Sequence, residues 1–205
     1  MKIYFYMKVI FDKILSLIAL LILSPLFILL SILIKLDSKG PVFFKQRRIG
    51  RYKKEFNILK FRTMRMDAPK NMPTHLLDNP GQYITKLGGF LRKSSLDELP
   101  QLINILAGNM SIVGPRPALW NQYDLISARD EFFANDLYPG LTGWAQVNGR
   151  DELPIEVKAA YDGEYVKKAS LLFDLKILFK TAANVMGSKG VVEGANSRNN
   201  TYTNV

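Results

Sequence analysis

One long apolar run dominates the hydropathy pattern of the chain. Residues 14–34 form 21 consecutive positions without a charged side chain, and a helix of about 20 apolar residues is long enough to cross a bilayer. A buried core helix fits poorly because no face of the run is polar. A cleaved signal peptide also fits poorly, because the run is too long and no small-residue cleavage site follows it. The pattern therefore predicts a membrane helix.

Ser24 and Pro25 lie at the midpoint of this run. Pro25 has no N–H to donate to the carbonyl of Leu21, and its ring crowds that turn, whereas the Ser24 hydroxyl can bond a preceding carbonyl. Lysines and arginines flank the run on both sides, and positive charge favours the cytoplasmic side of a membrane segment. A re-entrant helix–break–helix satisfies both flanks; a kinked spanning helix is the alternative that the pattern leaves open.

The rest of the chain alternates short extended segments with helical ones, so we expect an α+β fold that is mostly helical. Two extended segments joined near Gly50 predict a short β-hairpin, and residues 67–80 are predicted to be a loop. The helix predicted at 171–186 is amphipathic and could pack on the core or lie on the bilayer surface. The extended segments are 41–49 and 55–64, the helices are 84–92, 96–106, 119–134, 154–168 and 171–186, and 142–149 is a loop or strand.

Composition narrows the chemistry. The chain has no cysteine and one histidine, His75, which excludes a thiolate nucleophile, an iron–sulfur cluster and a multi-histidine metal site. We expect His75 to be a surface residue. The net charge of +10 arises entirely within residues 1–66, which carry 14 basic and 3 acidic residues, against 14 and 15 in residues 67–205. Nucleic-acid binding is one interpretation, but no nucleic-acid-binding fold is recognisable, and cations beside an apolar run suit anionic lipid headgroups.

Two adjacent carboxylates, Asp97 and Glu98, are the strongest candidates for chemistry. Ser95 and Glu98 also match a helix capping box, which is the structural alternative. Arg92 and Arg116 lie close in sequence on either side, and arginines beside a helix start can bind phosphate. Carboxylates among such cations can hold Mg²⁺ or attack a phosphorus atom.

Further cations and aromatics have two interpretations each. Arg116 stands between two prolines, on a stiff backbone that suits a phosphate contact or a surface ion pair. Lys60 and Arg62 should share one face of a strand, facing either substrate or solvent. Trp144 and Tyr165 are expected to be core or interface residues.

Several short motifs occur in one order, and together they resemble the bacterial sugar transferase family, the monotopic phosphoglycosyl transferases, and especially its small members of the PglC type. The resemblance covers about residues 8–187. The motifs are Ser24-Pro25, PVFF at 41–44 with Arg48 and Gly50, KFRTM at 60–64, LDELPQL at 96–102, MSIVGPRP at 110–117 and PGLTGWAQVNGR at 139–150.

This resemblance implies a reaction. A UDP-sugar would donate its sugar-1-phosphate to a polyprenol (undecaprenyl) phosphate and start glycan assembly, with Asp97 as nucleophile and Mg²⁺ ligand and Glu98 as its partner. It implies a re-entrant break at Ser24-Pro25 and substrate contacts from Lys60, Arg62, Arg92, Arg116, Gln146 and Arg150.

The resemblance also implies a place in the cell and a division of the chain. The partners would be the two substrates, membrane headgroups and downstream glycosyltransferases, without nucleic acid. The protein would sit in the bacterial inner membrane. The division would be a membrane segment over 1–38, a cytoplasmic catalytic domain over 39–187 and a polar tail over 188–205.

Overall fold

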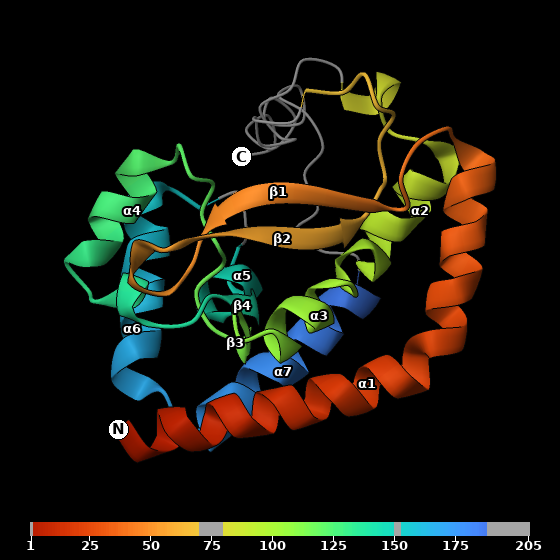
Figure 1. The fold of residues 1–205 in the computed structure, drawn as a ribbon. Helices are drawn as coiled ribbons and strands as arrows, with labels where there is room; N and C mark the ends of the chain where they lie inside the picture. Colours follow the sequence, from red (N-terminus) through yellow and green to blue (C-terminus); the bar gives the residue numbers. More distant parts are fainter. Residues whose placement is uncertain (1, 70–79, 150–152, 188–205) are drawn as a thin grey trace.

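A long bent helix wraps around a small α+β body in the computed structural model of the protein (Figure 1). The structure describes residues 2–69, 80–149 and 153–187; His75, Arg150 and the predicted tail therefore lie outside the described residues. The helices are α1 (Lys2–Asp37), α2 (Lys86–Lys93), α3 (Gln101–Leu106), α4 (Tyr123–Asp130), α5 (Trp144–Val147), α6 (Ile155–Lys168) and α7 (Leu171–Met186). The strands are β1 (Phe43–Ile49), β2 (Glu55–Phe61), β3 (Ser111–Val113) and β4 (Gly140–Thr142).

Helix α1 is continuous through Pro25 but bends sharply near its middle, so its two halves run along different sides of the body (Figure 1). The Ser24 hydroxyl donates to the carbonyl of Leu21 at 2.8 Å. This bond satisfies the carbonyl that Pro25 cannot reach, which is the compensation predicted from the sequence. The predicted break is thus a bend within one helix.

The two halves of α1 pack on different parts of the body. In the first half, Leu20 and Leu23 lie against a cluster that includes Leu102 and Ile105 of α3. In the second half, Leu30 and Ile34 pack with Phe61 of β2 and Leu91 of α2, and both are almost fully buried. Apolar contacts therefore stabilise the bend on each side of it.

The outer face of α1 remains apolar and exposed. Among the described residues, α1 is the helix that is long and apolar enough to cross a membrane, by length and composition. Large apolar surface that no protein atom covers indicates a lipid environment, so the protein associates with a membrane. The exposed side chains on α1 include Leu21, Ile22, Ile28, Leu29 and Ile32.

The predicted β-hairpin is confirmed. Strands β1 and β2 are antiparallel, with Phe43 opposite Phe61 and Ile49 opposite Glu55. A 3₁₀ turn at Arg51–Lys53 joins them, directly after Gly50. Helices α6 and α7 also lie where the pattern predicts them, at 155–168 and 171–186.

Other predicted elements are wrong in extent or type. The helix predicted over 96–106 divides into a 3₁₀ turn, η4 (Leu96–Glu98), and α3, because Pro100 lies between them and has no N–H to continue the ladder. The helix predicted over 119–134 reaches only from Tyr123 to Asp130. The loop or strand predicted at 142–149 instead begins as the last residue of β4 and then forms α5.

A small parallel pair was not predicted. Ser111 pairs with Gly140 and Val113 with Thr142. Strands of three residues are too short to show an alternating pattern. The pairing also needs glycine, because a Cβ on Gly140 would lie 2.1 Å from the backbone nitrogen of Gly114.

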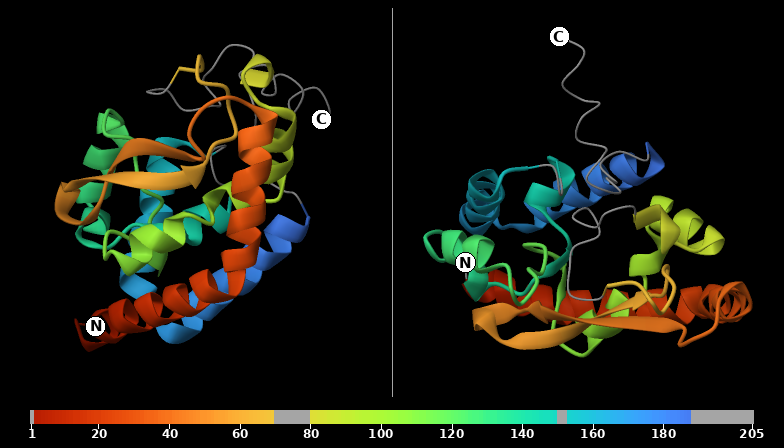
Figure 2. Two further views of the ribbon diagram at one scale, coloured as in Figure 1. Left: turned by 45° about the vertical axis from the view of Figure 1, so that its right-hand side comes forward. Right: turned by 90° about the horizontal axis from the view of Figure 1, so that it is seen from above.

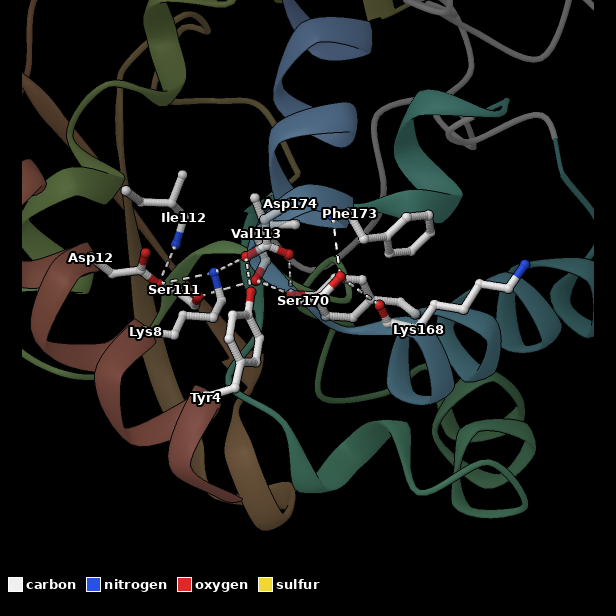
Figure 3. Close-up of polar contacts among 11 residues, drawn as sticks. Tyr4, Lys8, Asp12, Ser111, Ile112, Val113, Lys168, Ser170, Phe173 and Asp174 are labelled. Atoms are coloured by element: carbon white, nitrogen blue, oxygen red, sulfur yellow. Dashed lines mark hydrogen bonds and ion pairs between the residues drawn. The ribbon is translucent and has the colours of Figure 1, made fainter. Parts of the chain in front are cut away.

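A buried polar cluster, which we call the clasp, ties the start of α1 to the body (Figure 3). Lys8 Nζ lies 2.6 Å from Asp174 Oδ2 of α7 and 3.3 Å from Asp12 Oδ2. Hydroxyls of Tyr4 and Tyr165 also donate to Asp174, at 2.7 and 2.8 Å.

The clasp continues through Asp12 to β3, since Asp12 accepts hydrogen bonds from the Ser111 hydroxyl and the Ile112 amide. Lys8 is one of the lysines that precede the apolar run, but it is 9% exposed and its charge is paired inside the protein. It therefore does not face lipid headgroups.

Viewed from above, the molecule has two sides. The β-hairpin, α1 and α3 lie on one side, and α5, α6 and α7 lie on the other (Figure 2, right). Side chains from both sides line a common cavity, including Lys60 of β2 and Thr181 of α7. The fold thus places residues far apart in the sequence around one space.

Candidate active site

The cavity has a volume of about 740 Å³ and is lined by Asp97 and Glu98 together with cationic side chains. Among the predicted site residues it is also lined by Lys60, Arg62, Arg92, Arg116 and Gln146. The structure therefore brings together every predicted substrate-binding residue that it describes. A cavity of this size can hold a nucleotide-linked sugar.

The turn that carries Asp97 has an unusual backbone. Ser95, immediately before η4, has φ +58°, and its side chain makes no capping hydrogen bond. The capping box that the spacing of Ser95 and Glu98 allowed is therefore not formed. Non-glycine residues in the left-handed region cost energy and are frequent at functional sites. Here the turn presents both carboxylates to the cavity.

Glu98 is held by two cations. Its Oε1 accepts a hydrogen bond from Lys60 Nζ at 2.6 Å, and both terminal nitrogens of Arg116 lie 3.4 Å from the same oxygen. The proline-flanked backbone of Arg116 and the paired strand of Lys60 fix these side chains. Glu98 thus positions the two cations beside its neighbour, Asp97.

Asp97 is 8% exposed, and Lys60 Nζ lies 3.9 Å from its Oδ2. Burial, and to a smaller extent the charge of Glu98, raise the pKa of Asp97, while Lys60, Arg92 and Arg116 lower it, and the net result is a pKa of about 6. The carboxylate is therefore less stable as an anion than an exposed aspartate, yet still ionised in most molecules at neutral pH. A poorly solvated anion beside three cationic side chains is suited to nucleophilic attack on a phosphate group.

Arg62 is placed differently from the other cations. Its guanidinium donates to the carbonyls of Ile34, Ser38 and Lys39 at 3.2, 2.6 and 2.9 Å. Ile34 lies in the last turn of α1, where its carbonyl also accepts a hydrogen bond from the Ser38 amide at 3.3 Å, and Ser38 and Lys39 directly follow the helix. These contacts therefore cap the C-terminal end of α1. The structure gives Arg62 this helix-capping role, and its predicted contact with substrate stays a prediction.

Trp144 and Tyr165 are core residues, as expected. They form a buried cluster with Val113 and Ile177. Gln146 on α5 is 7% exposed, and its Nε2 donates to the carbonyl of Leu141 at 3.0 Å.

A family model described as bacterial sugar transferase matches residues 3–188 of the chain. The chain belongs to the bacterial sugar transferase family. It is 41% identical over 194 residues to the exopolysaccharide production protein ExoY of Sinorhizobium fredii, an alignment that covers 88% of this chain and 85% of that protein.

Two longer relatives carry names that state a reaction. The UDP-glucose:undecaprenyl-phosphate glucose-1-phosphate transferase of Xanthomonas campestris is 43% identical over 189 residues, covering 89% of this chain and 39% of that protein. The undecaprenyl-phosphate galactose phosphotransferase of Salmonella typhimurium is 36% identical over 199 residues, covering 90% of this chain and 41% of that protein. This sugar transferase chain thus spans less than half the length of these two relatives.

The carboxylates of this sugar transferase can hold Mg²⁺ only in a site that the substrate helps to form. Among the described residues, no group of three or more histidine, aspartate or glutamate side chains is arranged to hold a metal ion. Mg²⁺, however, is commonly bound by one or two carboxylates plus substrate phosphates and water. Asp97 and Glu98 satisfy that requirement only together with a phosphate-bearing substrate.

Several polar residues of this region were not predicted. Thr142 and Thr181 line the cavity and are hydrogen-bonded to each other at 2.7 Å, although 39 residues separate them. Arg129 and Asp162 form a buried ion pair at 2.6 Å in the adjoining wall. No spacing along the chain signals these pairs, because each joins two separate elements.

Proposed function

We propose that this protein transfers a sugar-1-phosphate from a UDP-sugar to a polyprenol phosphate at the cytoplasmic face of the bacterial inner membrane. The observation that carries this proposal is the buried Asp97 carboxylate in a cavity whose wall also holds Lys60, Arg92 and Arg116. The name of the Xanthomonas relative states both kinds of substrate, and the name of the Salmonella relative states undecaprenyl phosphate as well.

In the first step, a carboxylate oxygen of Asp97 attacks the sugar-bearing phosphorus of the donor. The bond from that phosphorus to the oxygen bridging the two phosphates breaks, and UMP leaves with the bonding electron pair. The product on the protein is a glycosyl-phosphoryl aspartate. Phosphoryl transfer depends mainly on positioning and charge stabilisation, which the cations around Glu98 supply.

In the second step, a phosphate oxygen of the polyprenol phosphate attacks the same phosphorus. The bond from phosphorus to Asp97 breaks, the carboxylate is restored and a polyprenyl diphosphate sugar is released. Two steps at one carboxylate allow a soluble donor and a lipid acceptor to use the same cavity in turn. Mg²⁺ held by Asp97 and Glu98 would neutralise charge on the diphosphate.

The bent α1 supports a re-entrant topology in this proposal. Its exposed apolar face enters the bilayer, while both ends return to the side of the catalytic body. A helix that does not cross the membrane keeps the cavity near the headgroups, where a lipid phosphate lies. Downstream glycosyltransferases would extend the lipid-linked sugar.

The direct test is release of UMP from a panel of UDP-sugars by the purified protein in lipid nanodiscs containing undecaprenyl phosphate. We expect UMP release with at least one donor, dependent on the lipid and on Mg²⁺, and a loss of at least about 10³-fold in Asp97→Asn. Asp124→Asn, at an exposed aspartate of α4, is the matched control and should retain activity. Full activity in Asp97→Asn would refute the assignment of the nucleophile.

A further inference from the structure

One end of the cavity differs in chemistry from the region around Asp97. We call it the α7 end. It is lined by Leu141, Thr142, Gln146, Leu178, Thr181 and Val185. These side chains are apolar or neutral, whereas the region around Asp97 is lined by charged ones. A neutral polar group of the substrate is therefore better suited to this end than a phosphate is.

Gln146 has an unused acceptor at this end. Its Oε1 atom is buried and has no hydrogen-bond partner among the described residues, while its Nε2 donates to the carbonyl of Leu141. Exchanging the two amide atoms would place an oxygen against the Leu141 carbonyl, so the hydrogen bond fixes the orientation. A buried acceptor without a partner carries a desolvation cost that a ligand donor would remove.

Thr142 presents a second acceptor. The Thr181 hydroxyl donates to the carbonyl of Ile177 at 2.8 Å. Because a hydroxyl has one proton, Thr142 is then the donor in the 2.7 Å contact between the two threonines. The lone pairs of Thr142 Oγ1 remain as acceptors. The α7 end therefore offers acceptors to a ligand.

This pattern discriminates among the parts of a UDP-sugar. Phosphate oxygens are acceptors and would face other acceptors. The uracil edge has one N–H donor between two carbonyl acceptors, so it would match only in part. The ribose and the transferred sugar both carry hydroxyl donors, but the transferred sugar carries more of them, and its C–H faces can pack on Leu141, Leu178 and Val185. The affinity for UDP, which contains the ribose alone, distinguishes the two.

We propose that the α7 end is the subsite for the transferred sugar, with Gln146 Oε1 accepting a hydrogen bond from a sugar hydroxyl and Thr142 acting as a second acceptor. This proposal rests on the proposed function, since it assumes a UDP-sugar donor. It makes Gln146 a residue that determines specificity among donors by the position of their hydroxyls.

The test compares binding of UDP and of UDP-sugars to the full-length protein in nanodiscs by calorimetry. The donor is the UDP-hexose or UDP-N-acetylhexosamine that the wild type binds most tightly. In Gln146→Met, which keeps the volume but removes the acceptor, affinity for this donor should fall about 3- to 10-fold. Affinity for UDP, which lacks the transferred sugar, should stay within about twofold and thereby serves as the control for folding.

Thr142→Val is the second variant, because it removes the other acceptor without disturbing the bond from Gln146 to Leu141. It should show the same loss for the UDP-sugar and the same unchanged affinity for UDP. A deoxy donor lacking the contacted hydroxyl should bind more weakly to wild type but lose nothing further in Gln146→Met.

Three results would overturn the sugar subsite. The first is an equal loss of UDP and UDP-sugar affinity in both variants, which would indicate a nucleotide subsite. The second is wild-type affinity for the donor in both variants. The third is that the wild type binds every UDP-sugar tested with the same affinity as UDP. UMP release by the wild type tests the proposed function separately, so a failed subsite would leave the transferase activity standing.

Discussion

Burial raises the pKa of Asp97 and three cations lower it, which leaves the pKa at about 6. The proposed attack requires the ionised carboxylate. Activity should therefore rise with pH through about 6 and level off above it, since the anion is the reactive form. A profile of kcat/KM against pH for UMP release measures this limb, and an activity that is flat from pH 5 to 8 would contradict it.

Lys60 is the largest of the influences that lower the pKa of Asp97. Lys60→Met should therefore move the acidic limb of the profile to higher pH, in addition to lowering the plateau. Lys53→Met removes an exposed lysine of the hairpin turn and is the matched control. It should leave both limb and plateau in place. If the acidic limb does not shift in Lys60→Met, the limb does not report the ionisation of Asp97.

The raised pKa also has a consequence for stability. A carboxyl whose pKa is higher in the folded protein destabilises the fold above that pKa, and this cost disappears as pH falls through about 6 towards 4. Asp97→Asn should thus stabilise the protein at pH 8 by up to about 3 kcal/mol. Thermal unfolding of wild type and Asp97→Asn at pH 8 and pH 4.5 measures this stabilisation, with Asp124→Asn as the control. An equal effect at both pH values would contradict the account.

Among the elements, α1 shows what a local pattern can and cannot predict. The apolar run, the bend at Pro25 and the compensating Ser24 hydroxyl all follow from neighbouring residues, and the structure confirms the bond from Ser24 to Leu21. The cap that Arg62 provides for the end of α1 could not be predicted, because it depends on where β2 ends relative to a helix 28 residues earlier.

The topology of α1 can be measured cleanly because the chain has no cysteine. Tyr6→Cys places a thiol at an exposed position near the start of α1, and Tyr123→Cys places one on the exposed surface of the body. In sealed vesicles of known orientation, an impermeant maleimide should label both from the same side if α1 is re-entrant. Labelling of the two from opposite sides would establish a spanning helix.

Pro25→Ala tests the cause of the bend. The substitution restores an N–H at residue 25 that can donate to the carbonyl of Leu21, so the straight helix is favoured. In this background, the cysteine at position 6 should become labelled from the opposite side while the cysteine at 123 does not change. Unchanged labelling of both would show that packing on α2 and α3, together with the clasp, holds the bend without Pro25.

The clasp joins the membrane helix and the catalytic body. Lys8→Met would leave the buried carboxylates of Asp12 and Asp174 without their cation. This should destabilise the protein by roughly 3 kcal/mol. Lys168→Met removes a lysine whose pair with Glu164 is largely exposed, and should cost less than about 1 kcal/mol. Thermal unfolding in nanodiscs compares the two, and equal shifts would argue against the clasp.

The fold class, the hairpin, α6 and α7 were predictable because each follows from periodicity within one segment. The candidate site was predictable chiefly from the resemblance of its motifs to a family. Spacing alone was compatible both with a helix cap and with a catalytic role for Asp97 and Glu98. The geometry decided against the cap, because Ser95 makes no capping bond and Glu98 points to Lys60 and Arg116. The α7 end and the clasp could not be predicted because each joins side chains of separate elements, and the clasp joins elements from opposite ends of the chain.

The covalent step at Asp97 is tested most directly by labelling. The protein is incubated with a UDP-sugar carrying labelled phosphorus at the sugar-bearing position, without lipid acceptor, and the peptide that contains Asp97 is analysed by mass spectrometry. We expect a phosphosugar adduct on Asp97 that disappears when polyprenol phosphate is added and never forms in Asp97→Asn. Product formation with the lipid, under conditions where no label ever reaches the protein, would contradict the covalent mechanism.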